Sequence, residues 1–402
     1  MASATSKQFT GNQPAGTQAK INRTCDLIRA FYTDQSGEYH PTAVDEATLR
    51  TFLTSDKICS PRPGPSDYLD DYRTKMSLIP QMRALVQNDG HPALEQASFW
   101  AALWCMPASD ILALIHELQT HPILKRIHES GKLQMSVKGI PQLLKIFRGT
   151  NSDISTKDNS NTPKKVVYKR DKSEVSFTLR RDKELCVITG TLHPQVCHIF
   201  PFSSLNHQER TKSCLLGMTK LWGEDRVIKL NSQLVNDGTG KNIVDTAANM
   251  ISLSPQLHAW WSRGYFALEP MEAPEPVEVQ TTTPTRSTFK TAWRIKLRFH
   301  WLQKTSIFNL LSTVNYSDDP VTKFEDLGCN LNIVDARTWR PVESGQVITI
   351  TADSPEHLPN YDILLLQWDL LRMWRLSGGA DPSNYPFDDE YDSDEETGCN
   401  SH

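Results

Sequence analysis

The stretch from Cys186 to Leu268 constrains this chain most, because residues that can activate water, bind metals or form tight turns recur there at usable spacings. It includes CVITGTLHPQVCHIFPFS and, after a polar insertion, AANMISLSPQLHAWWSRGYFAL. Two short apolar runs, 185–188 and 196–200, are joined by a Thr-Gly turn and a His-Pro dipeptide. This pattern predicts a β-hairpin.

The second half of the stretch predicts a strand followed by a helix. The apolar run 250–253 comes directly after Asn249, and a Ser-Pro dipeptide then gives the serine cap and first-turn proline typical of a helix N-terminus. His258 lies one turn into this helix. Strands, loop and helix therefore leave His198, Asn249 and His258 as the polar residues that could converge.

Three sequence elements in this order resemble the HNH endonuclease superfamily, in the variant common in uncharacterised fungal proteins. They are C-x-x-T-G, then C-H-I-x-P, then N-x-x-x-L-S-P-x-L-H. The resemblance covers roughly a fifth of the chain, and the roughly 50 residues between His198 and Asn249 exceed what the compact motif requires. It implies a ββα-metal core and an enzyme that hydrolyses phosphodiester bonds of DNA.

The same resemblance implies roles for five residues. His198 matches the general base that takes a proton from water, and Asn249 matches the loop residue that orients the site. His258 matches the ligand of a divalent ion, Mg²⁺, Mn²⁺ or Zn²⁺, that polarises the phosphate. In many relatives the metal site also includes the residue before the base, here Cys197, and the residue four positions after the ligand histidine, here Ser262.

Ser262 departs from the family pattern, which is usually acidic at this position. Residues four apart share a helix face, so an acid here would lie beside His258. A serine hydroxyl is a weak ligand for Mg²⁺, which prefers carboxylate oxygens. The sequence thus leaves two alternatives, an active endonuclease or a catalytically degenerate module that acts as a nucleic-acid or protein interaction scaffold. His207 could supply a replacement ligand.

Cys197 has two interpretations as well. A thiolate beside imidazoles suits Zn²⁺ better than Mg²⁺, whereas a cysteine that points inward on a strand acts as a small apolar core residue. The chain has 8 cysteines but no C-x-x-C pair. Neither a treble-clef zinc site nor a dense disulfide framework is therefore indicated, and Cys186 is expected to be structural.

Length and composition predict two or three lobes, since 402 residues that are 38% hydrophobic can bury a large core. The helical patterns before the motif and the ββα core that the resemblance implies make the expected fold class α+β. The expected organisation is a disordered segment 1–20, an α-helical lobe 21–149, a linker 150–175, an HNH-like nuclease domain 176–375 with an insertion 203–247 and C-terminal strands and helix, and an acidic disordered tail 376–402.

The net charge of −4 hides an uneven distribution. Eight Lys and Arg residues between Lys164 and Lys183 precede the motif, and segments 166–170 and 174–181 alternate as two strands with outward cations would. Such an approach suits a phosphate backbone, although a solvated linker or a nuclear import signal would have the same composition. The acidic tail could mimic nucleic acid or simply keep the chain soluble.

Towards the C-terminus, the sequence predicts one strand and one helix. Apolar and basic residues alternate over 293–301, so that Arg294, Lys296 and Arg298 share one face of a strand. This face could touch a nucleic-acid backbone or could be the solvated side of a sheet. The run 362–375 is a strongly apolar helix expected to dock on the core.

Apolar runs long enough to cross a bilayer are absent from the sequence, and the N-terminus has no apolar signal region. We therefore expect no membrane partner and an intracellular location, nuclear or cytoplasmic. The sequence does not indicate an oligomeric state.

Overall fold

The computed structural model describes residues 68–87, 92–148, 169–235, 242–283, 286–307, 309–325 and 331–378. All of them belong to one compact unit, residues 61–402. The predicted disordered segment 1–20, the linker from 150 to 168 and the acidic tail from 379 onward lie outside the described residues.

The described part begins with helices, as predicted. They are α3 (Tyr72–Gln87), the 3-10 helix η2 (Pro92–Glu95), α4 (Ala97–Cys105), α5 (Ala108–Thr120) and α6 (Ile123–Phe147). Every residue of α4 is buried, which is typical of a helix at the centre of a core. Proline precedes both α5 and α6 at the N-cap, where it ends the previous turn and costs no helical hydrogen bond.

The segment that leads into the motif is helical, so the prediction of strands over 174–181 is wrong. This helix, α7, spans Lys172–Arg181. The Asp171 side chain caps it by accepting a hydrogen bond from the Ser173 N–H at 2.8 Å. Thr178 is its fully buried residue, and Arg181 packs inward to donate to the Met250 carbonyl. The cap and these inward contacts outweigh the local alternation of apolar residues.

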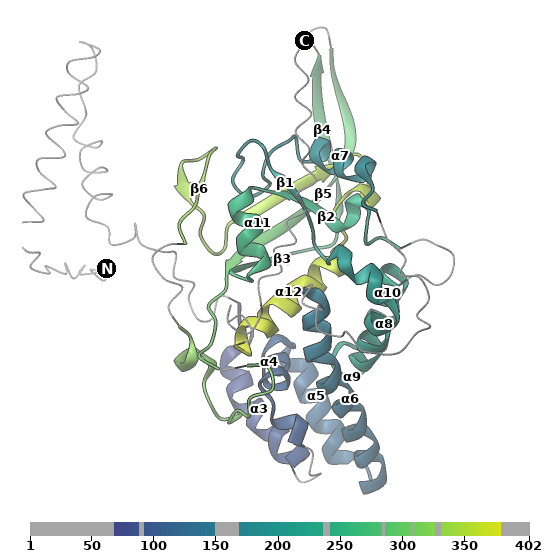
Figure 1. The fold of residues 1–402 in the computed structure, drawn as a ribbon, viewed down its shortest axis with the longest axis vertical. Helices are drawn as coiled ribbons and strands as arrows, with labels where there is room; N and C mark the ends of the chain where they lie inside the picture. Colours follow the sequence, from purple (N-terminus) through teal and green to yellow (C-terminus); the bar gives the residue numbers. More distant parts are fainter. Residues whose placement is uncertain are drawn as a thin grey trace, which may run out of the picture. The chain divides into compact units, whose positions relative to one another are not determined.

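The two strands of the motif are not the predicted hairpin partners. Residues 185–188 form a turn and a single bridge, Leu185 to Leu192. Strand β1 (Gln195–His198) instead pairs antiparallel with β2 (Met250–Leu253). Helix α11 (Pro255–Ser262) follows directly, with Ser254 as its N-cap as predicted. The segment therefore has the β-β-α order, and the strands meet across a long insertion (Figure 1).

The insertion between β1 and β2 is helical. It contains η4 (Phe202–His207), α8 (Gln208–Gly217), α9 (Thr219–Trp222), α10 (Glu224–Leu234) and η5 (Ala247–Asn249). Helices α8 and α9 follow one another almost without a break, and α10 completes the insertion's helical part. Helix α8 packs on α6, where the Ser136 hydroxyl donates to the Gly217 carbonyl. The insertion therefore joins the motif to the helical region.

A four-stranded antiparallel sheet lies after the motif, with β5 (Arg286–Trp301) as its central strand. β3 (Phe266–Pro270) and β4 (Glu275–Thr283) pair with its two halves, and β8 (Val347–Ala352) pairs along its other edge. Leu297, Phe299 and Trp301 are fully buried, which confirms the predicted alternation. The remaining short elements are η6 (Pro320–Lys323), β6 (Val334–Asp335), β7 (Arg340–Pro341) and η7 (Pro355–His357).

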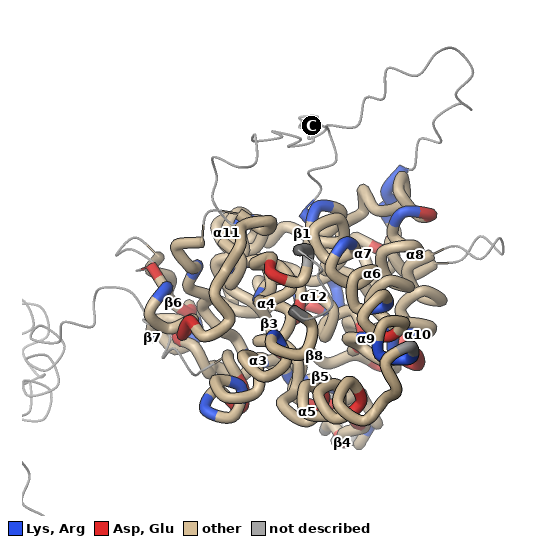
Figure 2. The backbone as a smooth tube through the Cα atoms, turned by 90° about the horizontal axis from the view of Figure 1, so that it is seen from below, with Lys and Arg blue, Asp and Glu red and all other residues tan. Residues whose placement is uncertain are grey.

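The cationic face of β5 is neutralised within the sheet. Arg294 and Lys296 lie 2.7 and 3.2 Å from Glu275, while Arg298 and His300 lie 3.1 and 2.9 Å from Glu269. These pairings favour the solvated sheet face over a nucleic-acid contact. In Figure 2, Lys, Arg, Asp and Glu positions are intermixed, and no side of the described chain seen in that view is wholly cationic.

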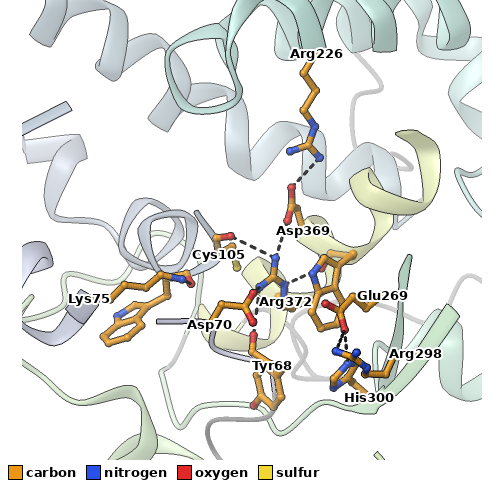
Figure 3. Close-up of polar contacts among 12 residues, drawn as sticks. Tyr68, Asp70, Lys75, Cys105, Arg226, Glu269, Arg298, His300, Asp369 and Arg372 are labelled. Atoms are coloured by element: carbon orange, nitrogen blue, oxygen red, sulfur yellow. Dashed lines mark hydrogen bonds and ion pairs between the residues drawn. The ribbon is translucent and has the colours of Figure 1, made fainter. Parts of the chain in front are cut away.

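Helix α12 (Tyr361–Leu376) packs between the sheet and α4, confirming the predicted core helix. Its Arg372 is 2% exposed and donates to the Tyr68 and Cys105 carbonyls and to Asp369. Asp369 also pairs with Arg226 of α10 (Figure 3). We call these buried groups the Arg372 network. It ties together the helical region, the insertion and α12.

Among the described residues, no single helix is long and apolar enough to cross a membrane. Helices α4 and α5 would qualify together by length and composition, and the bend between them is 117°.

Candidate active site

His198 stands at the end of β1, with 9% of its side chain exposed. Its Nε2 lies 3.2 Å from Oδ1 of Asp245. A carboxylate can only accept a hydrogen bond, so Nε2 carries the proton and the neutral ring has its lone pair on Nδ1. No described residue hydrogen-bonds to that Nδ1. The imidazole is therefore held in the tautomer that can accept a proton at Nδ1.

Asp245 is itself held in place from the other side. Its Oδ2 accepts a hydrogen bond of 2.7 Å from the backbone N–H of Asp171, the residue that caps α7. The carboxylate is thus fixed by the chain on one side and by His198 on the other. A carboxylate in this position stabilises the imidazolium that forms when the ring takes up a proton.

An aromatic ring brings a cation close to His198. The Phe202 ring lies 5.5 Å from the His198 ring, and the Arg170 guanidinium lies 5.6 Å from the centre of the same Phe202 ring. Guanidinium groups bind phosphate oxygens through several N–H donors. The basic approach predicted from the sequence therefore reaches the site through Arg170. Arg181, another of its cations, is buried and serves the fold.

Asn249 lies behind the imidazole rather than beside it. Its amide is fully buried and accepts from Phe200 N–H at 2.8 Å while donating to the carbonyls of Phe200 and Val244 at 2.7 and 2.8 Å. These bonds tie the chain after β1 to the residue before Asp245. Asn249 therefore positions the site through the backbone, and the side chain in contact with His198 is Asp245.

Asp245 is the site residue that sequence reasoning missed. Its one local signal is an acidic residue at the end of the insertion, four positions before Asn249. Nothing in the spacing links it to His198, which is 47 positions away. The contact arises only because β1 and β2 pair across the insertion.

His258 projects from α11 towards the same site and is half-buried. Its Nδ1 lies 2.8 Å from Oε1 of Gln195, the first residue of β1. An amide oxygen only accepts, so Nδ1 donates and the lone pair lies on Nε2. No described residue hydrogen-bonds to that Nε2. A metal ion binds this form of the ring.

The surroundings of His258 favour its neutral form. Burial lowers the pKa of His258, and the positive charges of Arg170 and of a protonated His198 lower it further. The ring therefore stays neutral at lower pH than a free histidine does. Because a metal ligand must be deprotonated, this shift extends metal binding to lower pH.

Cys197 faces the core, away from the imidazoles. Adjacent residues of a strand point to opposite faces, and the Cys197 side chain is buried while His198 reaches the surface. Burial raises the pKa of the thiol well above its ordinary value, and the neighbouring Cys186 adds to this effect. The structure thus places Cys197 as an apolar core residue and does not bring it to His258.

Ser262 lies one turn after His258, as the helix requires, but its hydroxyl is exposed and donates to the Ala259 carbonyl at 2.9 Å. His207 ends η4 in the insertion. Within the described ranges, no three His, Cys, Asp or Glu residues are grouped so that they could hold a metal ion. The described residues thus offer one imidazole nitrogen, Nε2 of His258, as a donor on this side of the site, and no carboxylate beside it.

A strand, a loop, a second strand and a helix that bring two imidazoles to one site define a nuclease-like ββα unit. The comparison with protein families agrees, because residues 186–269, about a fifth of the chain, match the family described as HNH endonuclease. This match confirms the sequence resemblance for that segment. No curated protein and no solved structure matches the chain.

Proposed function

We propose that this protein is a metal-dependent endonuclease of the HNH type that hydrolyses phosphodiester bonds of DNA. The observation that carries the proposal is the hydrogen bond between His198 and Asp245, within a segment that matches an endonuclease family. It leaves Nδ1 of His198 as a general base. The facing His258 leaves a second imidazole nitrogen for a divalent ion, Mg²⁺, Mn²⁺ or Zn²⁺.

The reaction requires a proton to leave water as its oxygen attacks phosphorus. His198 takes this proton at Nδ1, and Asp245 stabilises the resulting imidazolium through the Nε2–H bond. Arg170 is placed to contact a phosphate oxygen. A divalent ion bound at His258 supplies polarisation of the phosphate and stabilisation of the leaving oxygen. General-base catalysis of this kind contributes about 10²- to 10⁴-fold.

A second candidate function is a catalytically degenerate HNH module that serves as a nucleic-acid or protein scaffold. Ser262 favours it, since the position that would carry a carboxylate instead has a hydroxyl bonded to its own helix. A single imidazole binds a hard cation weakly without a carboxylate. The two functions differ in whether metal binding supports cleavage.

Cleavage of supercoiled plasmid DNA tests the proposal. Parent, His198→Ala and His258→Ala proteins are assayed with Mg²⁺, Mn²⁺ or Zn²⁺, and His116→Ala, an exposed histidine of α5, is the matched control. We expect His198→Ala to cut about 10²- to 10⁴-fold more slowly and His116→Ala to cut like the parent. Equal rates for His198→Ala and the parent would disprove the assignment of the base.

Ser262→Asp separates the two candidate functions. If a weakly held ion limits activity, restoring the carboxylate one turn after His258 raises both metal affinity, measured by calorimetry, and the cleavage rate. The scaffold function is supported if the parent and Ser262→Asp both bind DNA but neither cleaves it with any of the three ions.

Substrate, origin and location extend the proposal. We take DNA as the substrate, the variant of the family common in fungal proteins as the pattern that this chain follows, and an intracellular location, nuclear or cytoplasmic. Parallel cleavage assays with RNA of the same sequence test the first of these. Imaging a tagged chain tests the last.

A further inference from the structure

Trp339 combines two unfavourable properties at the tip of the β6–β7 hairpin. Its side chain is 82% exposed, more than any other large hydrophobic side chain of the described residues. Its backbone is also left-handed, with φ at +55°. Bulky residues rarely adopt this conformation, which disfavours them relative to glycine. Neither property contributes to stability, so the tryptophan points to a role outside the fold.

The hairpin holds the backbone of Trp339 in place although its side chain is largely exposed. The Asp335 carbonyl accepts from Trp339 N–H at 2.8 Å, and the Asp335 carboxylate accepts from Arg337 N–H at 2.9 Å and from its guanidinium at 3.0 Å. Burial alone would raise the pKa of Asp335, but the Arg337 hydrogen bonds outweigh it and hold that pKa below its ordinary value. The backbone that carries the ring is therefore held in a preformed conformation.

The same hairpin is seated on the nuclease motif. Arg337 donates to the Ile188 carbonyl at 2.7 Å, and Ala336 N–H donates to the Thr189 carbonyl at 2.7 Å. Gly190, at φ +67°, allows this contact, because a Cβ there would lie 2.8 Å from Arg337 Cδ. The Thr-Gly of the motif thus receives the hairpin, and Figure 1 shows β6 beside α11.

The chain that supports Trp339 leads directly to the metal-ligand candidate. Five residues after Gly190, Gln195 begins β1 and accepts the hydrogen bond from His258. The exposed ring and the imidazole are therefore held by the two ends of one short segment.

The charge beside Trp339 identifies the kind of partner. Arg340 is exposed and has no ion pair among the described residues, whereas the charge of Arg337 is taken by Asp335. An aromatic face next to an available guanidinium matches the base and phosphate of a nucleotide. Bases inside a duplex are already stacked on their neighbours, so only an unpaired base can stack on the ring.

We propose that Trp339 stacks on an unpaired base of the substrate while Arg340 contacts the adjoining phosphate, so that the enzyme prefers single-stranded or locally unpaired DNA. This inference rests on the proposed endonuclease function. Single-stranded DNA and single-stranded RNA both offer an unpaired base and a phosphate. Binding measured with oligonucleotides of each kind shows which of the two the protein prefers.

Fluorescence anisotropy measures the effect directly. A labelled single strand and the duplex of the same sequence are titrated with protein in the His198→Ala background, which removes cleavage from the measurement. We expect Trp339→Ala to weaken single-strand binding about 5- to 150-fold and to leave duplex binding unchanged. Trp339→Phe should retain most of the affinity. Phe289→Ala, which removes a 70% exposed aromatic ring from β5, is the matched control without effect.

Trp339→Gly keeps the test valid if other variants fold poorly. Glycine suits the left-handed backbone, so this variant should be at least as stable as the parent in thermal melts while losing single-strand affinity. Arg340→Gln should reduce the slope of log affinity against log salt concentration by the amount expected for about one lost phosphate contact.

Two outcomes overturn the inference. If neither Trp339→Ala nor Trp339→Gly changes the affinity for single strands, the ring does not contact nucleic acid and belongs to a protein-binding surface. If the variants lose as much affinity for duplex as for single strands, the ring contributes to nucleic-acid binding without a preference for unpaired bases. Failure of the endonuclease proposal gives a different result. The parent protein would then not cleave DNA, while its binding to single strands would still depend on Trp339.

Discussion

The Arg372 network and the ββα site both gather ionisable groups around a helix, yet they treat those groups in opposite ways. In the network, Arg372 is 2% exposed, and Asp369 is shared between Arg372 and Arg226. At the site, the described residues leave one ring nitrogen of His198 and one of His258 without a hydrogen bond. In the network, Arg372 and Asp369 are bonded to each other and to neighbouring groups, whereas each imidazole of the site keeps one ring nitrogen without such a bond among the described residues.

This difference shows that charge density alone does not locate the chemistry. A buried charge is tolerated only when its hydrogen bonds are made, so a dense and fully paired cluster stabilises the fold without being able to act on a substrate. A catalytic group must be oriented by the protein and still have a donor or acceptor atom that the protein itself does not hydrogen-bond. The sparse pair of histidines meets this condition.

Arg372→Met gives the largest expected effect and acts on the fold alone. Removing the guanidinium leaves the Tyr68 and Cys105 carbonyls buried without this donor, so the free energy of unfolding should fall by about 3–5 kcal/mol. Urea denaturation measures it. Arg83→Met is the matched control, because its pair with Glu95 is partly exposed and contributes about 0–1 kcal/mol. A loss below about 1 kcal/mol for Arg372→Met would contradict the structural role.

Lys75 gives a pH dependence to the same region. Burial, and after it the positive charge of Arg372, lower the pKa of Lys75 from its ordinary 10.5 to about 8. Between these values the unfolded chain keeps a proton that the folded chain releases, so stability from this group rises with pH from about 8 to 10.5. The full change is on the order of 3 kcal/mol.

Unfolding measured at several pH values tests this for Lys75. The stability of the parent relative to Lys75→Met should increase across that window and be constant below pH 8. A difference that stays flat through the window would show that the ammonium is not destabilised by burial.

Arg372→Met should lower stability, whereas Asp245→Asn should reduce activity at little cost in stability. The amide cannot stabilise an imidazolium as a carboxylate does, so cleavage should slow about 10- to 100-fold, while the free energy of unfolding changes by about 1 kcal/mol or less. Asp245→Glu keeps the charge and should recover part of the rate. If Asp245→Glu were as slow as Asp245→Asn, the carboxylate would be structural only.

Elements with a strong local pattern were predictable from the sequence. The alternation over 293–301 gave β5, the apolar run 362–375 gave α12, and the Ser-Pro start gave α11. Each depends on residues near one another in the chain, so period and capping suffice. The α+β class and the HNH segment followed from the same local signals.

Features that depend on distant partners were not predictable. Residues 174–181 alternate like a strand, but the Asp171 cap and the contacts of Arg181 with the β2 segment make them helical. The pairing of β1 with β2 and the contact of Asp245 with His198 span the whole insertion. The partners of Asn249 were hidden for the same reason, since they are backbone groups that only the folded insertion brings near.

The insertion between β1 and β2 also bears on when the site forms. His198 pairs with Met250 across roughly 50 residues, so closing this pair costs more chain entropy than a tight hairpin would, and such non-local contacts form slowly. Helix α8 docks on α6, which precedes the motif, and α10 contacts α12, which follows it. A nascent chain released as far as residue 269 therefore carries both histidines, while the packing of α10 on α12 still waits for residues 361–376.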